Sequence, residues 1–155
     1  MSKHAPKKIR INHDDYYAEY VGHTADKRQF FLTNPFVPAM GGSNGREFLA
    51  LYIFDAEGSL FDAKIDDLGV RENKILPGNK LDPSFVSSLI QTRLAELDKI
   101  SFRDIKVAPF RVERFGREFG LIAHAPEEPD EDWWVTAEPG DYMAFYPPWD
   151  GDYDT

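Results

Sequence analysis

The alternation of apolar and polar residues predicts a chain built mainly from β-strands. Short segments rich in aromatic and β-branched residues are separated by clusters of Pro, Gly, Asn and Asp, which favour turns. Residues 47–54 are apolar on both faces, so we expect a central strand that is covered on both sides. The expected strands are 16–23, 29–33, 47–54, 59–65, 102–113, 118–124, 133–137 and 142–146.

Residues 83–99 have the spacing of a long amphipathic helix. Asp82 is a suitable N-cap and Pro83 suits the first helical turn. The preceding residues 66–81 are expected to form a loop. The sequence therefore predicts a single α+β domain over residues 1–155, with a mostly antiparallel sheet of about seven or eight strands and this helix on one face. The apolar stripe that would contact the sheet consists of Val86, Ile90, Leu94, Leu97 and Ile100.

Composition narrows the function classes. The chain has 155 residues and no cysteine, which excludes disulfides, thiolate nucleophiles and Cys-ligated metal sites. Its longest unbroken apolar run, residues 48–54, is too short to span a membrane. The basic segment at residues 3–10 is followed by polar residues 12–15, where a signal peptide requires an apolar stretch. These features favour a cytoplasmic protein without a membrane partner.

Charge is distributed unevenly along the chain. The net charge is −9, and residues 126–155 contain ten Asp and Glu but no Lys or Arg, so residues 1–125 have a net charge of +1. The acidic segment also holds all three tryptophans, which is unusual for a disordered acidic tail. We expect residues 147–155, beyond Pro147 and Pro148, to form an acidic aromatic C-terminal tail that stays outside the sheet. Residues 1–14 are expected to form a flexible N-terminal arm.

Candidate catalytic and metal-binding residues are few and weakly patterned. Residues 41–45 match the G-x-S-x-G motif of hydrolase nucleophile elbows, with Ser43 as the serine. That motif requires a strand-to-helix turn, whereas a strand is expected after Ser43, so we interpret the segment as a connecting loop. The four histidines lack metal-binding spacing, although His13 and His23 are near enough in sequence to meet across the first strand. We predict no catalytic residue, no metal site and no cofactor.

The acidic aromatic C-terminus predicts a non-enzymatic protein-binding domain. Aromatic side chains dominate interface hot spots, and carboxylates around them attract a basic partner. By analogy of size and acidity, we expect an inhibitor or immunity-type protein that neutralises a basic toxin or nuclease. The residues expected to bind this partner are Trp149, Asp150, Asp152 and Tyr153.

Other functions are compatible with the same sequence. A small hydrolase or other enzyme with a Ser/His/Asp-type site is one alternative, and a module that binds a small ligand under its helix is another. Either alternative requires a deep pocket with convergent polar groups. Nucleic acid is not an expected partner, because the acidic C-terminus repels the phosphate backbone.

Overall fold

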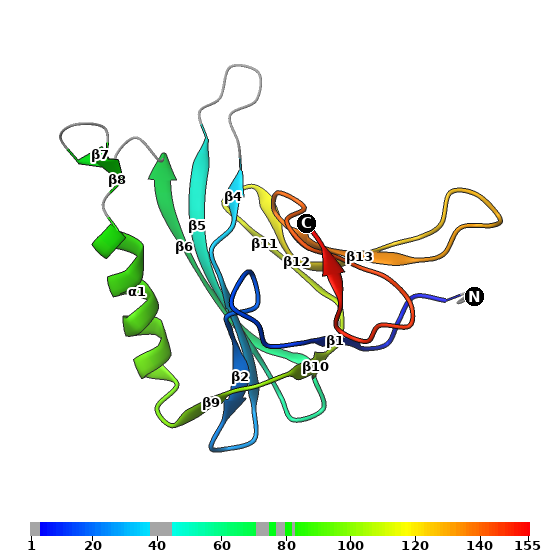
Figure 1. The fold of residues 1–155 in the computed structure, drawn as a ribbon, viewed down its shortest axis with the longest axis horizontal. Coiled ribbons are helices and arrows are strands. Elements are labelled where there is room, and N and C mark those ends of the chain that lie inside the picture. Colours follow the sequence, from blue (N-terminus) through cyan, green and yellow to red (C-terminus); the bar gives the residue numbers. More distant parts are fainter. Residues whose placement is uncertain (1–3, 38–44, 71–74, 77–79, 82) are drawn as a thin grey trace.

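The computed structural model describes residues 4–37, 45–70, 75–76, 80–81 and 83–155 of the chain. The strands form a six-stranded sheet, a five-stranded sheet and two two-stranded pairs, and their pairings are antiparallel (Figure 1). The helix α1 (Pro83–Glu96) lies against one face of the six-stranded sheet, and the five-stranded sheet lies on the other side. Within the described residues, no helix is both long and apolar enough to cross a membrane.

The six-stranded sheet is organised around one long strand. This strand, β5, pairs with β6 along one edge and with β3 and β4 along the other. β2 follows β3, and β9 forms the far edge beyond β2. The bounds of the six strands are β2 (Tyr20–Thr24), β3 (Gln29–Thr33), β4 (Phe36–Val37), β5 (Arg46–Phe54), β6 (Leu60–Val70) and β9 (Ile100–Phe102).

The remaining strands form the second layer and two small pairs. The five-stranded sheet has the sequential order β11 (Phe110–Arg114), β12 (Arg117–His124), β13 (Trp134–Glu138), β14 (Ala144–Phe145) and β15 (Tyr153–Asp154). β1 (Ile9–Ile11) pairs with β10 (Ile105–Val107), and β7 (Ile75–Leu76) pairs with β8 (Lys80–Leu81). Strands that follow one another in sequence, as in the five-stranded sheet, can pair antiparallel through short connections.

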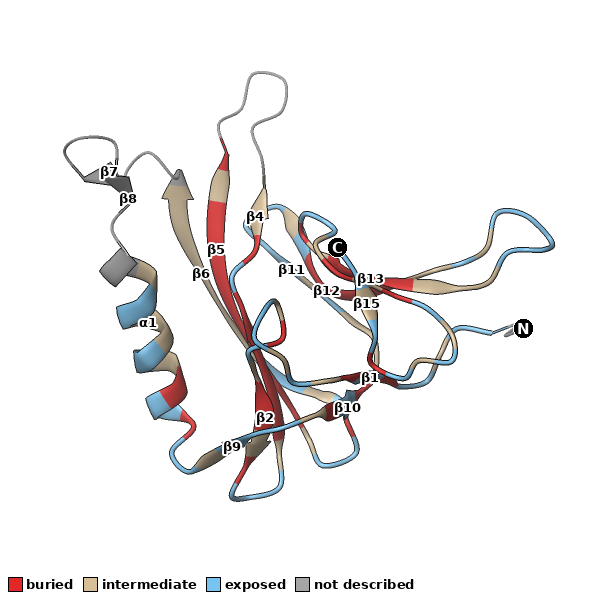
Figure 2. Cartoon of the chain, in the orientation of Figure 1, coloured by how far each residue is buried: buried red, intermediate tan, exposed pale blue. Residues whose placement is uncertain are grey.

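The alternation of side chains along β5 places a core on each side of the six-stranded sheet. Phe48 and Tyr52 face the five-stranded sheet, whereas Leu49 and Leu51 face α1. Successive side chains of a strand point to opposite faces, so a strand that is apolar throughout is buried on both. Figure 2 shows buried residues along β5 and at the C-terminal end of α1, where Leu94 is only 8% exposed.

The structure confirms the antiparallel, mostly β character of the prediction but not a single sheet. The predicted strand over 102–113 is divided among β9, β10 and β11, which pair with three different partners. The described residues contain fifteen strands instead of about seven or eight, because this division adds two strands and five more, β1, β4, β7, β8 and β15, are strands of two or three residues that were not predicted. The prediction of a long helix is wrong, because α1 has 14 residues and ends at Glu96, three residues before the predicted end. β6 extends to Val70, into the predicted loop.

Both chain ends were expected to be free, and this expectation is wrong for part of each. Ile9 and Ile11 are fully buried in β1, which pairs with β10, so these residues belong to the core and not to a flexible arm. At the other end, β15 pairs with β14, so the two prolines do not keep the last residues out of the sheet. The sequence pattern is too short in both segments to indicate these pairings, each of which joins only two or three residues.

Candidate functional site

The turn at residues 14–18 is held by the side chain of Asp14. Its Oδ1 accepts hydrogen bonds from the backbone N–H groups of Tyr16 (2.9 Å) and Ala18 (3.0 Å), and the Asp14 N–H donates to the Ala18 carbonyl (3.1 Å). An aspartate that bonds to its own following backbone replaces strand pairing with a turn. As a result β2 begins at Tyr20, four residues after the predicted start, and Tyr16 projects from the turn with 62% of its surface exposed.

The C-terminal segment packs beside this turn. The Tyr153 hydroxyl donates a short hydrogen bond to Asp14, and the Tyr17 N–H donates to the same hydroxyl (3.3 Å). The Asn12 side-chain amide donates to the Asp150 carbonyl (3.1 Å). Gly151 has φ +99°, and a Cβ there would lie 2.4 Å from Asn12 Cγ, so this contact requires glycine.

Two open concavities lie along this contact. The first has a volume of about 480 Å³, is lined by residues that include Asp14, Tyr16 and Asp152, and lies between the turn and the C-terminal segment. The second has a volume of about 270 Å³ and adjoins the first through Asp152 and Tyr153, which line both. We call this surface the acidic aromatic face and define it by Asp14, Tyr16, Tyr146, Asp150, Asp152, Tyr153 and Asp154.

A third concavity adjoins the face through Tyr16. This tyrosine pocket has a volume of about 300 Å³ and lies between α1, the end of β3 and the turn at residues 14–18. It is lined by Tyr16, Tyr17, Glu19, Tyr20, Leu32, Thr33, Asn34, Leu49 and Ile90.

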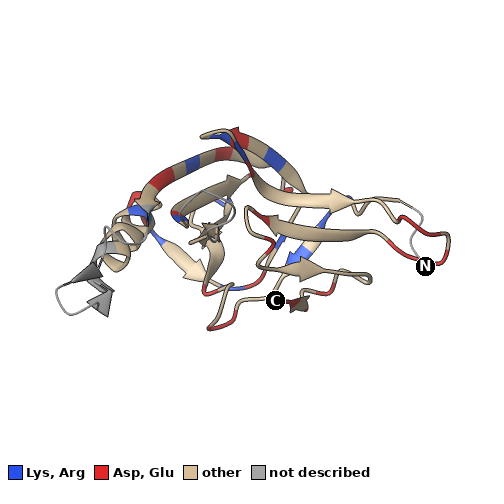
Figure 3. Ribbon diagram, turned by 90° about the horizontal axis from the view of Figure 1, so that it is seen from above, with Lys and Arg blue, Asp and Glu red and all other residues tan. Residues whose placement is uncertain are grey.

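The charge of the face is negative throughout. Of the described residues that line the three concavities, none is Lys or Arg. Asp150, Asp152 and Asp154 are exposed, and Figure 3 shows several acidic positions close to the C-terminus. Exposed aromatic surface accompanies these carboxylates, because Tyr146 is 47% exposed in addition to Tyr16.

Hydrogen bonds fix the ionisation of the groups at the centre of the face. Burial opposes ionisation of Asp14, but the hydrogen bonds from Tyr153, Tyr16 and Ala18 outweigh it and lower the pKa of the Asp14 carboxyl. Burial and the hydrogen bond to Asp14 raise the pKa of the Tyr153 hydroxyl. Asp14 is therefore an anion and Tyr153 a neutral donor at neutral pH.

The four residues predicted to bind a partner lie together, but not as expected. Asp150 and Asp152 are exposed on the acidic aromatic face. Trp149 and Tyr153 are half-buried and pack against the core, so the expectation that they project freely is wrong. Tyr16 is exposed and lines a concavity together with Asp14 and Asp152, although the sequence predicted a strand at this position.

The histidines contribute to structure at two places. His13 and His23 both approach Asp104: the His13 backbone N–H donates to its carboxylate (2.8 Å), and His23 Nε2 lies 2.9 Å from its carbonyl oxygen. The two imidazoles thus do not converge on a shared ligand position through these contacts. Across the described residues, no group of three or more His, Asp or Glu side chains is arranged to hold a metal ion.

The other side of the five-stranded sheet carries a His–Thr–Glu chain that the sequence analysis missed. His124 Nε2 lies 2.8 Å from Thr136 Oγ1, which donates to Glu138 (2.6 Å). In a hydrolase triad the hydroxyl donates to the histidine, so that the histidine can accept its proton. Here the Thr136 hydroxyl donates to a carboxylate and is buried, which gives it no activation as a nucleophile. Ser43 and residues 41–44 lie outside the described residues.

Comparison with known proteins adds no assignment, since no protein-family model, no curated protein and no solved structure matches this chain.

Proposed function

We propose that this chain is a non-enzymatic binding protein whose acidic aromatic face receives a basic segment of another protein, as an inhibitor or immunity-type protein acting on a basic toxin or nuclease would. One observation carries the proposal. Three adjoining concavities are lined by carboxylates and tyrosines, and no Lys or Arg is among their described lining residues.

Electrostatics favours a cationic partner for such a face. Clustered like charges raise the local concentration of an oppositely charged protein and increase its association rate. The tyrosine rings supply apolar contact area and have few rotatable bonds. Each hydroxyl can form a hydrogen bond with water in the free protein and with the partner in the complex. Several cations elsewhere in the described chain are engaged by carboxylates: Arg10 bonds to Asp104, Arg93 to Asp66 and Arg111 to Glu118.

The packing of the C-terminal segment also supports the proposal. A disordered acidic tail must lose conformational entropy when it binds, which lowers its affinity for a given contact area. Here β15 pairs with β14, and the Asp14–Tyr153 hydrogen bond joins the segment to the turn. The carboxylates on either side of Tyr153 are therefore presented by a folded backbone.

A charge-matched pair of variants tests the proposal with a nonalysine peptide as the probe. Asp150→Asn/Asp152→Asn removes two charges from the face, and Glu127→Gln/Glu128→Gln removes two from the exposed connector. We expect the first variant to bind roughly 2- to 30-fold more weakly at about 20 mM salt, because each of the two exposed charge pairs contributes about 0.2–1 kcal/mol. The second variant should bind like the wild type.

Salt dependence and the control decide the outcome. The difference between wild type and Asp150→Asn/Asp152→Asn should shrink at about 150 mM salt, because screening weakens exposed charge interactions. Fluorescence anisotropy gives the dissociation constants, and stopped-flow mixing gives the association rates. Equal losses in both variants would mean that only net charge matters, and the acidic aromatic face would not be the binding site.

A further inference from the structure

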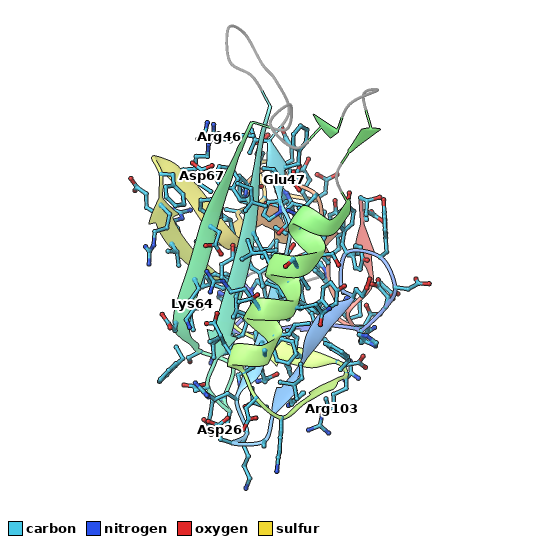
Figure 4. The ribbon with its side chains drawn as sticks, turned by 90° about the vertical axis from the view of Figure 1, so that its left-hand side faces the viewer. Asp26, Arg46, Glu47, Lys64, Asp67 and Arg103 are labelled. Carbon is cyan, nitrogen blue, oxygen red and sulfur yellow. The ribbon has the colours of Figure 1, made fainter. Side chains whose placement is uncertain are left out.

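The tyrosine pocket lies along one side of α1, and ion pairs to β6 lie along the other side. On the β6 side, Arg93 makes a two-pronged pair with Asp66 (2.8 and 3.0 Å), and Lys64 pairs with Glu96 (2.8 Å). Figure 4 faces α1 and shows Lys64 beside the helix on β6. On the other side the helix contributes Ile90 to the pocket, with Tyr16 of the turn among its other lining residues. The ion pairs thus hold the helix along one edge while the pocket stays accessible along the other.

The pocket offers hydrogen-bond acceptors. Burial and the neighbouring Glu19 carboxylate raise the pKa of Tyr20, so its hydroxyl stays protonated at neutral pH. The Asn34 amide nitrogen donates to the Phe48 carbonyl (2.6 Å), which leaves the Asn34 amide oxygen for a ligand. The Thr33 hydroxyl donates to the Tyr142 hydroxyl (3.0 Å). A ligand that matches these groups must itself be rich in donors.

The remaining surface of the pocket is apolar and aromatic. Leu32, Leu49 and Ile90 line it together with three tyrosines, of which Tyr16 and Tyr17 lie with ring centroids 4.3 Å apart. Aliphatic walls suit a hydrocarbon stem, and tyrosine faces attract a cation through the ring quadrupole. Glu19 supplies the opposite charge, and the described lining residues include no cation that would compete.

We propose that the tyrosine pocket binds one arginine side chain of the basic partner, an inference that rests on the proposed function. A guanidinium group has five N–H donors in one plane, which suits the Glu19 carboxylate and the Asn34 amide oxygen. It also stacks on aromatic rings and is more weakly hydrated than an ammonium group, so it leaves water more readily than lysine does. Tyr16 belongs to both the pocket and the acidic aromatic face, so a segment crossing the face can place an arginine here.

Blocked amino acids test the pocket separately from the rest of the face. Nα-acetyl-arginine methylamide, titrated into the ¹⁵N-labelled protein, should shift the amide signals of Tyr16, Tyr20 and Asn34, with a millimolar dissociation constant. The matching citrulline derivative has the same shape without the charge and should bind at least about fivefold more weakly, as a lost charge-assisted hydrogen bond implies. The lysine derivative should bind at least about threefold more weakly, because lysine lacks the planar donor fork.

Variants identify the carboxylate. Glu19→Gln should weaken binding of the arginine derivative at least about fivefold, whereas Glu57→Gln, an exposed glutamate of the hairpin turn, should leave it unchanged. Equal binding of the citrulline or lysine derivative, or no response in the pocket, would overturn the inference. Shifts confined to residues 150–154 would overturn it while leaving the proposed function intact. If Asp150→Asn/Asp152→Asn and Glu127→Gln/Glu128→Gln bound nonalysine equally well while the arginine derivative still bound in the pocket, only the proposed function would be contradicted.

Discussion

Replacing Asp14 by alanine should destabilise the protein by about 1–2 kcal/mol. The carboxylate accepts hydrogen bonds from the Tyr153 hydroxyl and from the backbone N–H groups of Tyr16 and Ala18. A hydrogen bond to a charged group contributes about 1.5–3 kcal/mol, but water replaces part of this where the site is half-exposed. The three donors would lose one shared acceptor, so the loss should exceed that of an ordinary surface substitution.

A double-mutant cycle isolates the bond that joins the turn to the C-terminal segment. Tyr153→Phe removes the hydroxyl and keeps the ring against Phe145, so it breaks the bond to Asp14 and also removes the acceptor of the Tyr17 N–H. The cycle separates the first effect from the second, because Asp14→Ala leaves the Tyr17 contact in place. Asp14→Ala, Tyr153→Phe and the double variant should give a coupling energy of about 1 kcal/mol in urea unfolding experiments. Asp15→Ala, at an exposed neighbouring acid, should change stability by less than about 0.5 kcal/mol. Additive effects, with coupling near zero, would show that the Asp14–Tyr153 bond does not stabilise the packing of the C-terminal segment on the turn.

The same link should appear in the pH dependence of stability. The folded-state pKa of Asp14 is lowered, so the unfolded chain binds this proton first as the pH falls. Its contribution is fully present above the unfolded pKa, near about 3.9, and is lost as the pH falls through the folded value. The stability difference between wild type and Asp14→Ala should therefore be constant from about pH 5 to pH 8 and shrink below about pH 4. A difference that stayed constant down to pH 2.5, roughly, would contradict this account.

Two further predictions concern the cores on either side of the six-stranded sheet. Leu94→Ala should lower the free energy of unfolding by about 2–5 kcal/mol, because Leu94 is buried between α1 and the sheet, whereas the exposed Gln91→Ala should change it by less than about 0.5 kcal/mol in urea melts. Tyr52→Phe should leave stability unchanged or raise it by up to about 1–2 kcal/mol, because the Tyr52 hydroxyl is buried in the described structure without a hydrogen-bond partner. Burial raises the pKa of Tyr52, so wild type loses stability as the pH rises above about 10, the pKa of tyrosine in the unfolded chain. Tyr52→Phe has no hydroxyl to ionise and should lose less stability in that range. If Tyr52→Phe instead lowered the free energy of unfolding by more than about 2 kcal/mol at neutral pH, the hydroxyl would have a hydrogen-bond partner.

Local pattern predicted the centre of the fold well. Residues 47–54 are apolar on both faces, and β5 is buried on both faces because α1 and the five-stranded sheet cover it. The helical stripe placed Leu94 and Leu97 correctly in the core under α1. The helix α1 is covered on one face and the strand β5 on both, so in each segment the spacing of apolar residues is enough to predict which side chains are buried.

The candidate site was predicted less well because it depends on contacts between the two ends of the chain. Ile9 pairs with Val107, and the Tyr153 hydroxyl bonds to Asp14, so partners lie far apart in sequence. Pairs of two or three residues leave no periodicity to detect. One local signal was available for the turn: Asp14 stands two residues before Tyr16, the arrangement in which an aspartate side chain bonds to the following backbone. That signal competes with the strand propensity of the tyrosines, and here the turn prevails.

The folded C-terminus changes what the acidic charge can do. A free tail presents its carboxylates at variable distances, so it attracts cations without selecting a shape. Once Tyr153 is bonded to Asp14 and Gly151 packs against Asn12, the carboxylates of Asp150 and Asp152 have a defined relation to Tyr16. If the proposed function holds, less entropy is lost on binding, and a partner must match both the charge and the position of the tyrosine pocket. Selectivity for one basic partner over other cationic proteins would therefore depend on the Asp14 link as well as on the number of acids.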